Sequence, residues 1–141
     1  MIRNNVQIYL AGQMDNVSSS DMNDWRRYTK KFWQGDDRIM ILDPCRRPHT
    51  TNLSEREIML LDLRDIDCAD IILVDNRDLG KPTFGTPCEV FYASYMLNKP
   101  VIAWNDGKKT SRKSVFQRAL FTNEFHSLEK ALDHITEYYV N

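Results

Sequence analysis

The chain has 141 residues, of which 42% are hydrophobic and 28% charged, and its formal net charge at pH 7 is -1. This composition indicates one globular domain, residues 1–141, and excludes a disordered chain or a fibrous repeat. The near-zero net charge offers no global field for a nucleic acid polymer or an anionic membrane. We therefore expect the partners to be small molecules or other copies of the chain.

The N-terminal segment and the cysteines bear on the cellular compartment. The first apolar run covers only residues 8–11, which is too short for a signal peptide or a membrane span. The chain has three cysteines, an odd number at wide spacing, and three histidines that do not stand at metal-ligand intervals from them. The sequence predicts a cytoplasmic protein with reduced thiols, without a metal or another cofactor.

Short apolar runs, rich in β-branched residues, alternate with longer amphipathic segments. The runs are residues 6–11, 39–43, 71–75 and 100–104, and a weaker one lies near residues 120–126. Runs that are apolar at consecutive positions are typical of strands buried on both faces of a parallel sheet. The pattern predicts a single-domain α/β fold, doubly wound, with a five-stranded, mostly parallel sheet and helices on both faces, as in flavodoxin-like and Rossmann-like proteins.

The amphipathic segments have recognisable helix starts. Asp21 is a candidate cap for a helix that ends near residue 34, before Gly35. Ser54, with Glu57 three residues later, has the pattern of a capping box and opens the second helix. A last helix covers residues 127–139, and the polar segment 106–114 is predicted to be a solvated loop.

The third predicted helix covers residues 86–97, and its start has two interpretations. Thr86, Pro87 and Glu89 match a capping threonine, a proline at the first helical position and a glutamate at the third, so that Glu89 would only cap the helix. Alternatively, Glu89 stays ionised near the positive end of the helix dipole and attacks a sugar as a nucleophile. The local pattern leaves both interpretations open.

Asp62 is an acid on an otherwise apolar stripe of the second helix. The other members of that stripe, by helical spacing, are Ile58, Ile66 and Ala69. A buried carboxylate needs a partner or a raised pKa. Asp62 therefore pairs with Arg56 or Arg64, lies at the edge of the apolar face, or donates a proton to a leaving group.

A ligand of a doubly wound sheet binds beyond the carboxyl ends of the strands. Small and polar residues gather at the ends of the first and third strands and in the loop LGKPTFGTPCE that follows the third. The substrate-binding candidates in these segments are Gly12, Gln13, Asp75, Asn76, Gly85 and Thr86.

Three separated segments resemble the nucleoside 2-deoxyribosyltransferases in order and spacing. They are Ile-Tyr-Leu-Ala-Gly at residues 8–12, Asp-Leu at 62–63 followed by Ala-Asp-Ile-Ile-Leu-Val at 69–74, and Gly-Thr-Pro-Cys-Glu at 85–89, which leads to Tyr-Ala at 92–93 and Lys-Pro-Val-Ile at 99–102. The match extends over roughly residues 6–104. It implies an enzyme that exchanges the base of a deoxynucleoside.

The resemblance also implies roles for single residues. Glu89 stands where the family has its nucleophile, Asp62 where an aspartate helps to protonate the nucleobase, and Tyr9 where a tyrosine orients the nucleophile. The implied reaction is a double displacement between a deoxynucleoside or deoxynucleotide and a free nucleobase. Because family members complete their sites with a neighbouring subunit, we expect a homo-oligomer, with Tyr138 and Tyr139 as candidate interface residues.

One position departs from the transferase pattern. Six residues before Glu89, many of these transferases carry an acid that helps to hold the sugar, whereas this chain has Thr83. The related 2-deoxynucleoside 5-monophosphate N-hydrolases have a hydroxyl residue there, used for phosphate, but their Arg- and Gly-rich segment is missing here, and Asp15 is a poor neighbour for a phosphate. The sequence predicts a transferase; monophosphate hydrolysis and a nucleotide-binding module without turnover are the alternatives.

Overall fold

The centre of the protein is a sheet of five parallel strands in the order β2-β1-β3-β4-β5. The structure, a computed structural model, describes residues 4–47, 52–108 and 115–140. The strands are β1 (Val6–Ala11), β2 (Ile39–Leu42), β3 (Ile71–Asp75), β4 (Val101–Trp104) and β5 (Asn123–Phe125). All five predicted runs contain a strand, and every neighbouring pair is parallel. The doubly wound α/β prediction is confirmed.

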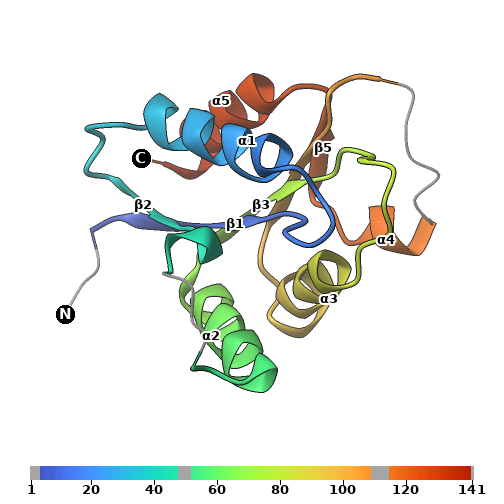
Figure 1. Ribbon diagram of the computed structural model, residues 1–141. Coiled ribbons are helices and arrows are strands. Elements are labelled where there is room, and N and C mark those ends of the chain that lie inside the picture. Colours follow the sequence, from blue (N-terminus) through green and yellow to red (C-terminus); the bar gives the residue numbers. More distant parts are fainter. Residues whose placement is uncertain (1–3, 48–51, 109–114, 141) are drawn as a thin grey trace.

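Helices cover both faces of the sheet (Figure 1). The helices α1 (Ser19–Phe32) and α5 (Leu128–Tyr139) pack on one face, and α2 (Glu55–Cys68) and α3 (Gly85–Phe91) on the other. A π-helical turn, η2 (Tyr92–Met96), continues α3, and a short 3-10 helix, η1 (Pro44–Arg46), follows β2. None of the described helices is both long and apolar enough to cross a membrane.

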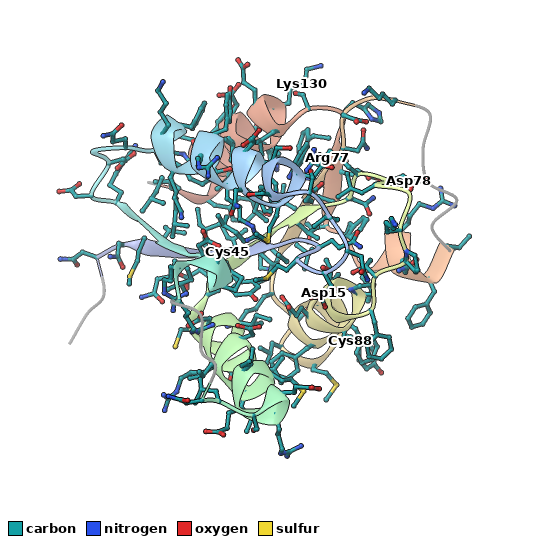
Figure 2. All side chains as sticks on the ribbon, in the orientation of Figure 1. Asp15, Cys45, Arg77, Asp78, Cys88 and Lys130 are labelled. Atoms are coloured by element: carbon teal, nitrogen blue, oxygen red, sulfur yellow. The ribbon has the colours of Figure 1, made fainter. Side chains whose placement is uncertain are left out.

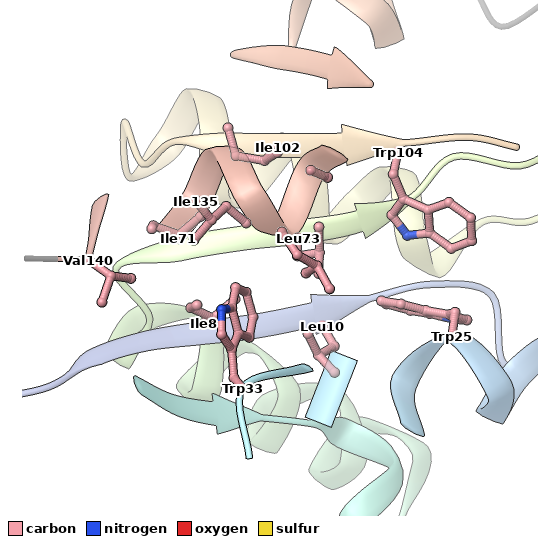
Figure 3. Close-up of a cluster of buried hydrophobic side chains, with 12 residues drawn as sticks. Ile8, Leu10, Trp25, Trp33, Ile71, Leu73, Ile102, Trp104, Ile135 and Val140 are labelled. Atoms are coloured by element: carbon pink, nitrogen blue, oxygen red, sulfur yellow. The ribbon is translucent and has the colours of Figure 1, made fainter. Parts of the chain in front are cut away.

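Each face of the sheet has its own apolar core, because successive side chains of a strand point to opposite faces. Figure 3 shows the core beneath α1 and α5, whose buried members include Ile8, Leu10, Ile71, Leu73 and Ile102. The core beneath α2 and α3 includes Tyr9, Ala11, Ile72, Val74 and Val90. The alternation thus places Tyr9 on the face of the sheet that α3 covers.

Two of the three proposed helix starts are corrected by the structure. The cap of α1 is Ser18, whose Oγ accepts a hydrogen bond from the backbone N–H of Asp21 at 3.0 Å, so Asp21 lies inside the first turn. The capping box of Ser54 and Glu57 is formed at the start of α2.

The helix α3 begins at Gly85, two residues before the predicted first position Pro87, and no side chain caps it. Glu89 is consequently the fifth helical residue, and the predicted capping box with Thr86 does not form. A glutamate reaches back to the cap only from the third position. The start of α3 therefore leaves the Glu89 carboxylate available for other contacts.

The C-terminal part follows the prediction except for one helix. Ser127 caps α5, in agreement with the predicted range. The short helix α4 (Val115–Ala119) was not predicted; it has five residues, none of them buried, and so shows no apolar stripe. Of the predicted loop 106–114, residues 109–114 lie outside the described part of the chain.

Candidate active site

A cleft of about 590 Å³ opens beyond the carboxyl end of β1, bounded by the loop after β1, by α2 and by the start of α3. We call this cavity the cleft. Neighbouring strands β1 and β3 are followed by helices on opposite faces of the sheet, so their carboxyl ends form the switch point where such folds bind ligands. The predicted site residues that line the cleft are Gly12, Gln13, Asp62, Thr83, Gly85, Thr86 and Glu89.

The Glu89 carboxyl lies in an environment that disfavours its charge. Burial is the main reason why the pKa of Glu89 is raised from 4.5 to about 7, and the negative charge of Asp62 raises it as well. The nearby Tyr9 hydroxyl, as a hydrogen-bond donor, and the positive charge of Arg26 lower the pKa. The sequence interpretation, in which the helix dipole keeps Glu89 fully ionised, therefore requires correction. The pKa of Glu89 therefore lies closer to neutral pH than that of an exposed glutamate.

Tyr9 is fully buried on β1, with its hydroxyl beside Glu89. Burial, followed by the neighbouring charge of Glu89, raises the pKa of Tyr9 far above its ordinary value, so the hydroxyl keeps its proton. The Tyr9 hydroxyl is close enough to Glu89 to lower the pKa of that carboxyl. Its geometry, however, does not meet the criteria of a hydrogen bond to any described residue. A buried donor without a partner can orient a carboxylate after a small movement.

Asp62 on α2 is half-buried, and its partner is neither Arg56 nor Arg64. Arg47, just after η1, donates from Nη1 to Oδ1 of Asp62 at 2.6 Å. Burial raises the pKa of Asp62 above its ordinary value, whereas the charge of Arg47 opposes that rise. Asp62 and Glu89 stand close enough that the charge of Asp62 raises the pKa of Glu89. The cleft thus holds two interacting acids in different environments.

Arg26 on α1 is a fully buried cation that supports the end of β1. Its guanidinium donates to the carbonyl oxygens of Leu10 at 2.8 Å and of Gly12 at 3.3 Å, and to Oδ1 of Asp43 at 3.1 Å. A buried arginine needs such a set of acceptors. Because its charge lowers the pKa of Glu89, it also favours the ionised form of that carboxyl.

Gly12 is the position at which the loop leaves β1 through a crowded space. A Cβ atom there would lie 2.8 Å from Cζ2 of Trp25 and 3.3 Å from Cβ of Asp75. The next residue, Gln13, donates from Nε2 to the carbonyl oxygens of Asp15 at 2.9 Å and of Pro82 at 3.3 Å. These contacts join the loop after β1 to the loop before α3.

Asp75 and Asn76 do not line the cleft, in contrast to the other predicted substrate-binding residues. Asp75 is buried and binds Arg77 through two hydrogen bonds of 3.0 and 2.8 Å, while Asn76 donates to Oε2 of Glu124 at 2.5 Å. Both line a second cavity of about 30 Å³, which shares Gln13, Thr83 and Thr86 with the cleft. Their present contacts support the ends of the strands rather than the cleft.

Several further residues, to which the sequence patterns gave no binding role, also line the cleft. They are Met14, Asp15, Asn16, Glu55, Ile58, Met59, Pro82 and Phe84. Figure 2 shows Asp15 on the loop after β1, Cys45 on the turn after β2 and Cys88 on α3. Asp15, considered from the sequence only as a poor neighbour for a phosphate, was signalled by its place in the loop after β1. The α2 residues gave no signal, because their exposure depends on the neighbouring loops.

All the ionisable acids and bases among the described residues that line the cleft are acids. Asp15, Glu55, Asp62 and Glu89 line it, and no lysine or arginine does. Within the described ranges, no group of three or more His, Cys, Asp or Glu side chains is arranged to hold a metal ion. The cleft therefore suits a neutral ligand with hydrogen-bonding groups.

Comparisons with known proteins place this geometry in a known fold. No family model matches the sequence, and no curated protein matches it. A conserved protein from Enterococcus faecalis has a similar structure, with a TM-score of 0.75 and 17% identity over 94% of this chain and 98% of that one. A 2-deoxyribosyltransferase from Bacillus psychrosaccharolyticus follows with a TM-score of 0.70 and 20% identity over 91% of each chain.

A 2-deoxyribosyltransferase from Leishmania mexicana is also similar, with a TM-score of 0.66 and 20% identity over 96% of this chain and 99% of that one. The class defined by these observations is a single-domain α/β protein with a carboxylate-lined cleft at the switch point of its sheet. More narrowly, the chain has the fold of the nucleoside 2-deoxyribosyltransferases, as the sequence resemblance implied.

Proposed function

We propose that this chain is a nucleoside 2-deoxyribosyltransferase, which moves 2-deoxyribose from one nucleobase to another through an ester of Glu89. The observation that carries the proposal is the position of the Glu89 carboxyl beside the buried Tyr9 hydroxyl, in a cleft whose α2 wall holds Asp62. A nucleophile and a proton donor flanking the sugar are what double displacement at an anomeric carbon requires. The likeness in fold to two 2-deoxyribosyltransferases supports the assignment.

The reaction begins with the ionised form of Glu89. Its oxygen attacks the anomeric carbon, the bond to the base nitrogen breaks, and the base leaves with the electron pair and a proton from Asp62. A second base then attacks the ester and returns its proton to Asp62, so the sugar keeps its configuration. Tyr9, which stays protonated, donates toward the Glu89 oxygen that does not attack.

The charge of the cleft favours a nucleoside over a nucleotide as the substrate. A monophosphate would add negative charge to a cavity already lined by Asp15, Glu55, Asp62 and Glu89. The nearest guanidinium to Asp62, that of Arg47, is engaged by Asp62 and Asp65 at 2.6 Å each. We therefore propose free deoxynucleosides and free nucleobases as the substrates.

A second candidate function is hydrolysis of 2-deoxynucleoside 5-monophosphates. The observation that favours it is a pair of hydroxyl residues, Thr83 and Thr86, on the wall of the cleft, because hydroxyls and backbone N–H groups can bind phosphate without a cation. Both reactions share the attack by Glu89 and differ in the acceptor. The four carboxylates of the cleft make this the weaker candidate.

One incubation separates the two functions. The purified chain is mixed with a deoxynucleoside, a deoxynucleoside monophosphate and a different free base, and the products are separated by chromatography. We expect a new deoxynucleoside that carries the second base. Release of deoxyribose 5-phosphate would instead identify the hydrolase.

Two variants connect either product to Glu89. Glu89→Gln should abolish both exchange and hydrolysis, whereas Glu137→Gln, an exposed position on α5, should retain wild-type rates. Mass spectrometry of the wild type with nucleoside alone should show an adduct of one deoxyribosyl group, absent in Glu89→Gln. A wild type that binds nucleosides without forming any product would show that the chain is a binding module.

We also propose that the chain forms a homo-oligomer. Phe91 stacks on Tyr95 and on Phe116, with ring centroids 5.3 and 6.3 Å apart, and the outer two rings are 71% and 66% exposed. Exposed aromatic clusters are typical of interfaces, and a net charge of -1 lets two copies approach without strong repulsion. Sedimentation should show an oligomer that Tyr95→Ser with Phe116→Ser converts to monomers; unchanged sedimentation would contradict this assignment.

A further inference from the structure

Four charged side chains form a continuous series beside the cleft, alternating between α2 and the segment after β2. Arg46 binds Asp65 through two bonds of 2.8 and 3.0 Å, and Arg47 binds the same carboxylate at 2.6 Å. Arg47 also donates to Oδ1 of Asp62 at 2.6 Å and to the carbonyl oxygen of Leu61 at 3.1 Å. The Arg47 guanidinium is thereby fixed at three acceptors, which leaves it one orientation.

The two carboxylates of this series, Asp65 and Asp62, differ in how many of their oxygens accept hydrogen bonds from arginines. Both oxygens of Asp65 are bound by arginines. Among the residues that the structure describes, Asp62 accepts a side-chain hydrogen bond at Oδ1, from Arg47, and none at Oδ2. Asp62 also lines the cleft and two adjoining cavities, of about 600 and 410 Å³. Its second oxygen is the one available to a ligand.

We propose that Arg47, held in place by Asp65, is a positioning residue that fixes Asp62 through Oδ1 and so presents Oδ2 for proton exchange with the nucleobase. This inference rests on the proposed function and adds to it a residue outside the pair of reacting acids. The series of hydrogen bonds determines which oxygen carries the proton and in which direction it points.

The proton balance follows from that geometry. Before cleavage the proton is on Oδ2, while Oδ1 accepts the hydrogen bond from Arg47. As the bond between sugar and base breaks, the base nitrogen takes the electron pair of that bond and the proton from Oδ2. Asp62 becomes a full carboxylate whose charge is balanced by Arg47, and it recovers the proton from the incoming base.

The charges around Asp62 determine how a change at Arg47 affects its titration. Arg47 and Arg46 favour the ionised form, and Asp65 opposes it. Glu55 on the same helix, and Glu89 and Asp15 on other walls of the cleft, are also acids. With Arg47 removed, burial and these carboxylates act with less opposition, so the pKa of Asp62 rises further and the break that it causes in the pH profile moves to higher pH.

Two substrates separate proton donation from other effects of Arg47. An ordinary deoxynucleoside needs a proton on its departing base, whereas 7-methyl-2-deoxyguanosine carries a positive base that leaves as a neutral molecule without one. For Arg47→Met we expect kcat with the ordinary substrate to fall roughly 10- to 100-fold, with a smaller change in KM. With the methylated substrate, the rate at which 7-methylguanine is released in a single turnover without an acceptor base should stay within about threefold of wild type.

Further variants test whether Arg47 acts on the rate through Asp62. Arg47→Lys should recover part of the loss, because an ammonium can still donate to Oδ1. Asp65→Asn should show the same dependence on substrate, and Arg47→Met should add no further loss in an Asp62→Asn background. The matched control is Arg64→Met, an exposed arginine on α2 that should behave as wild type with both substrates.

Some outcomes of these experiments would contradict the role of Arg47. Equal losses with both substrates, or an unchanged pH profile in Arg47→Met and Asp65→Asn variants that unfold at the wild-type temperature, would overturn the assignment of Arg47. Those results would leave the proposed function intact as long as Glu89→Gln is inactive with both substrates. A wild type that cleaves neither substrate would overturn both proposals.

Discussion

Replacing Glu89 by glutamine should remove activity and, at the same time, stabilise the fold at alkaline pH. The pKa of Glu89 is raised from 4.5 to about 7, chiefly by burial, so the folded protein binds its proton more tightly than the unfolded chain does. Below 4.5 the carboxyl is protonated in both states and nothing is lost. As the pH rises from 4.5 through about 7, the unfolded chain ionises first, and the free energy of unfolding falls.

The size of this effect follows from the same two pKa values. Between 4.5 and about 7 the loss accumulates at about 1.4 kcal/mol for each pH unit, giving about 3 kcal/mol at alkaline pH. Glutamine has a similar shape and no charge, so Glu89→Gln avoids this loss. The difference in free energy of unfolding between the variant and the wild type should therefore be about 3 kcal/mol larger at about pH 8 than at about pH 4, in favour of the variant.

Urea unfolding at the two pH values measures the difference. Trp25, Trp33 and Trp104 are buried, so their fluorescence reports unfolding of the whole domain. The control is Glu137→Gln, whose exposed side chain should give the same difference from wild type at both pH values. If Glu89→Gln shows no added stability at the higher pH, the Glu89 carboxyl is not held in the costly environment on which the reasoning depends.

Three further variants test separate parts of the site. Tyr9→Phe removes a hydroxyl that lowers the pKa of Glu89. The low-pH limb of the kcat/KM profile that belongs to Glu89 should therefore move above 7, and the rate at neutral pH should fall roughly tenfold. A limb that does not move would contradict the contact between the Tyr9 hydroxyl and Glu89. Gly12→Ala places a methyl group 2.8 Å from Trp25, and thermal unfolding should show a loss of about 1–3 kcal/mol, whereas wild-type stability would mean that the loop shifts freely. Asp15→Lys puts a cation on the cleft, and the ratio of kcat/KM for deoxynucleoside monophosphate to that for nucleoside should rise roughly tenfold; an unchanged ratio would show that a 5-phosphate lies elsewhere.

Much of the fold could be predicted because its signals are local. The runs at residues 6–11 and 71–75 coincide with β1 and β3, since a strand buried on both faces must be apolar at consecutive positions. The short helix α4 gave no such signal because none of its residues is buried. The true cap of α1 was missed because Ser18 and Asp21 are both good capping residues, and only the backbone conformation distinguishes them.

The candidate site was predictable to the extent that it depends on chain order. Gly12, Gln13 and the loop before α3 meet because parallel strands place their carboxyl ends at one edge of the sheet. The same rule also selected Asp75 and Asn76, which the structure places outside the cleft because Arg77 and Glu124 bind them. Those partners come from side-chain packing, which strand order does not specify.

The sequence by itself determined the strands, most of the helices and the edge of the sheet where a ligand would bind, because hydrophobic periodicity and capping patterns act between residues close in the chain. Only the tertiary structure excluded the capping interpretation of Glu89, since its pattern fits a capping box that does not form. It also supplied Arg47, fifteen residues away, as the partner of Asp62. Burial and charge at a site depend on neighbours that folding brings together, so the pKa of Glu89 near 7 is a property of the folded cleft.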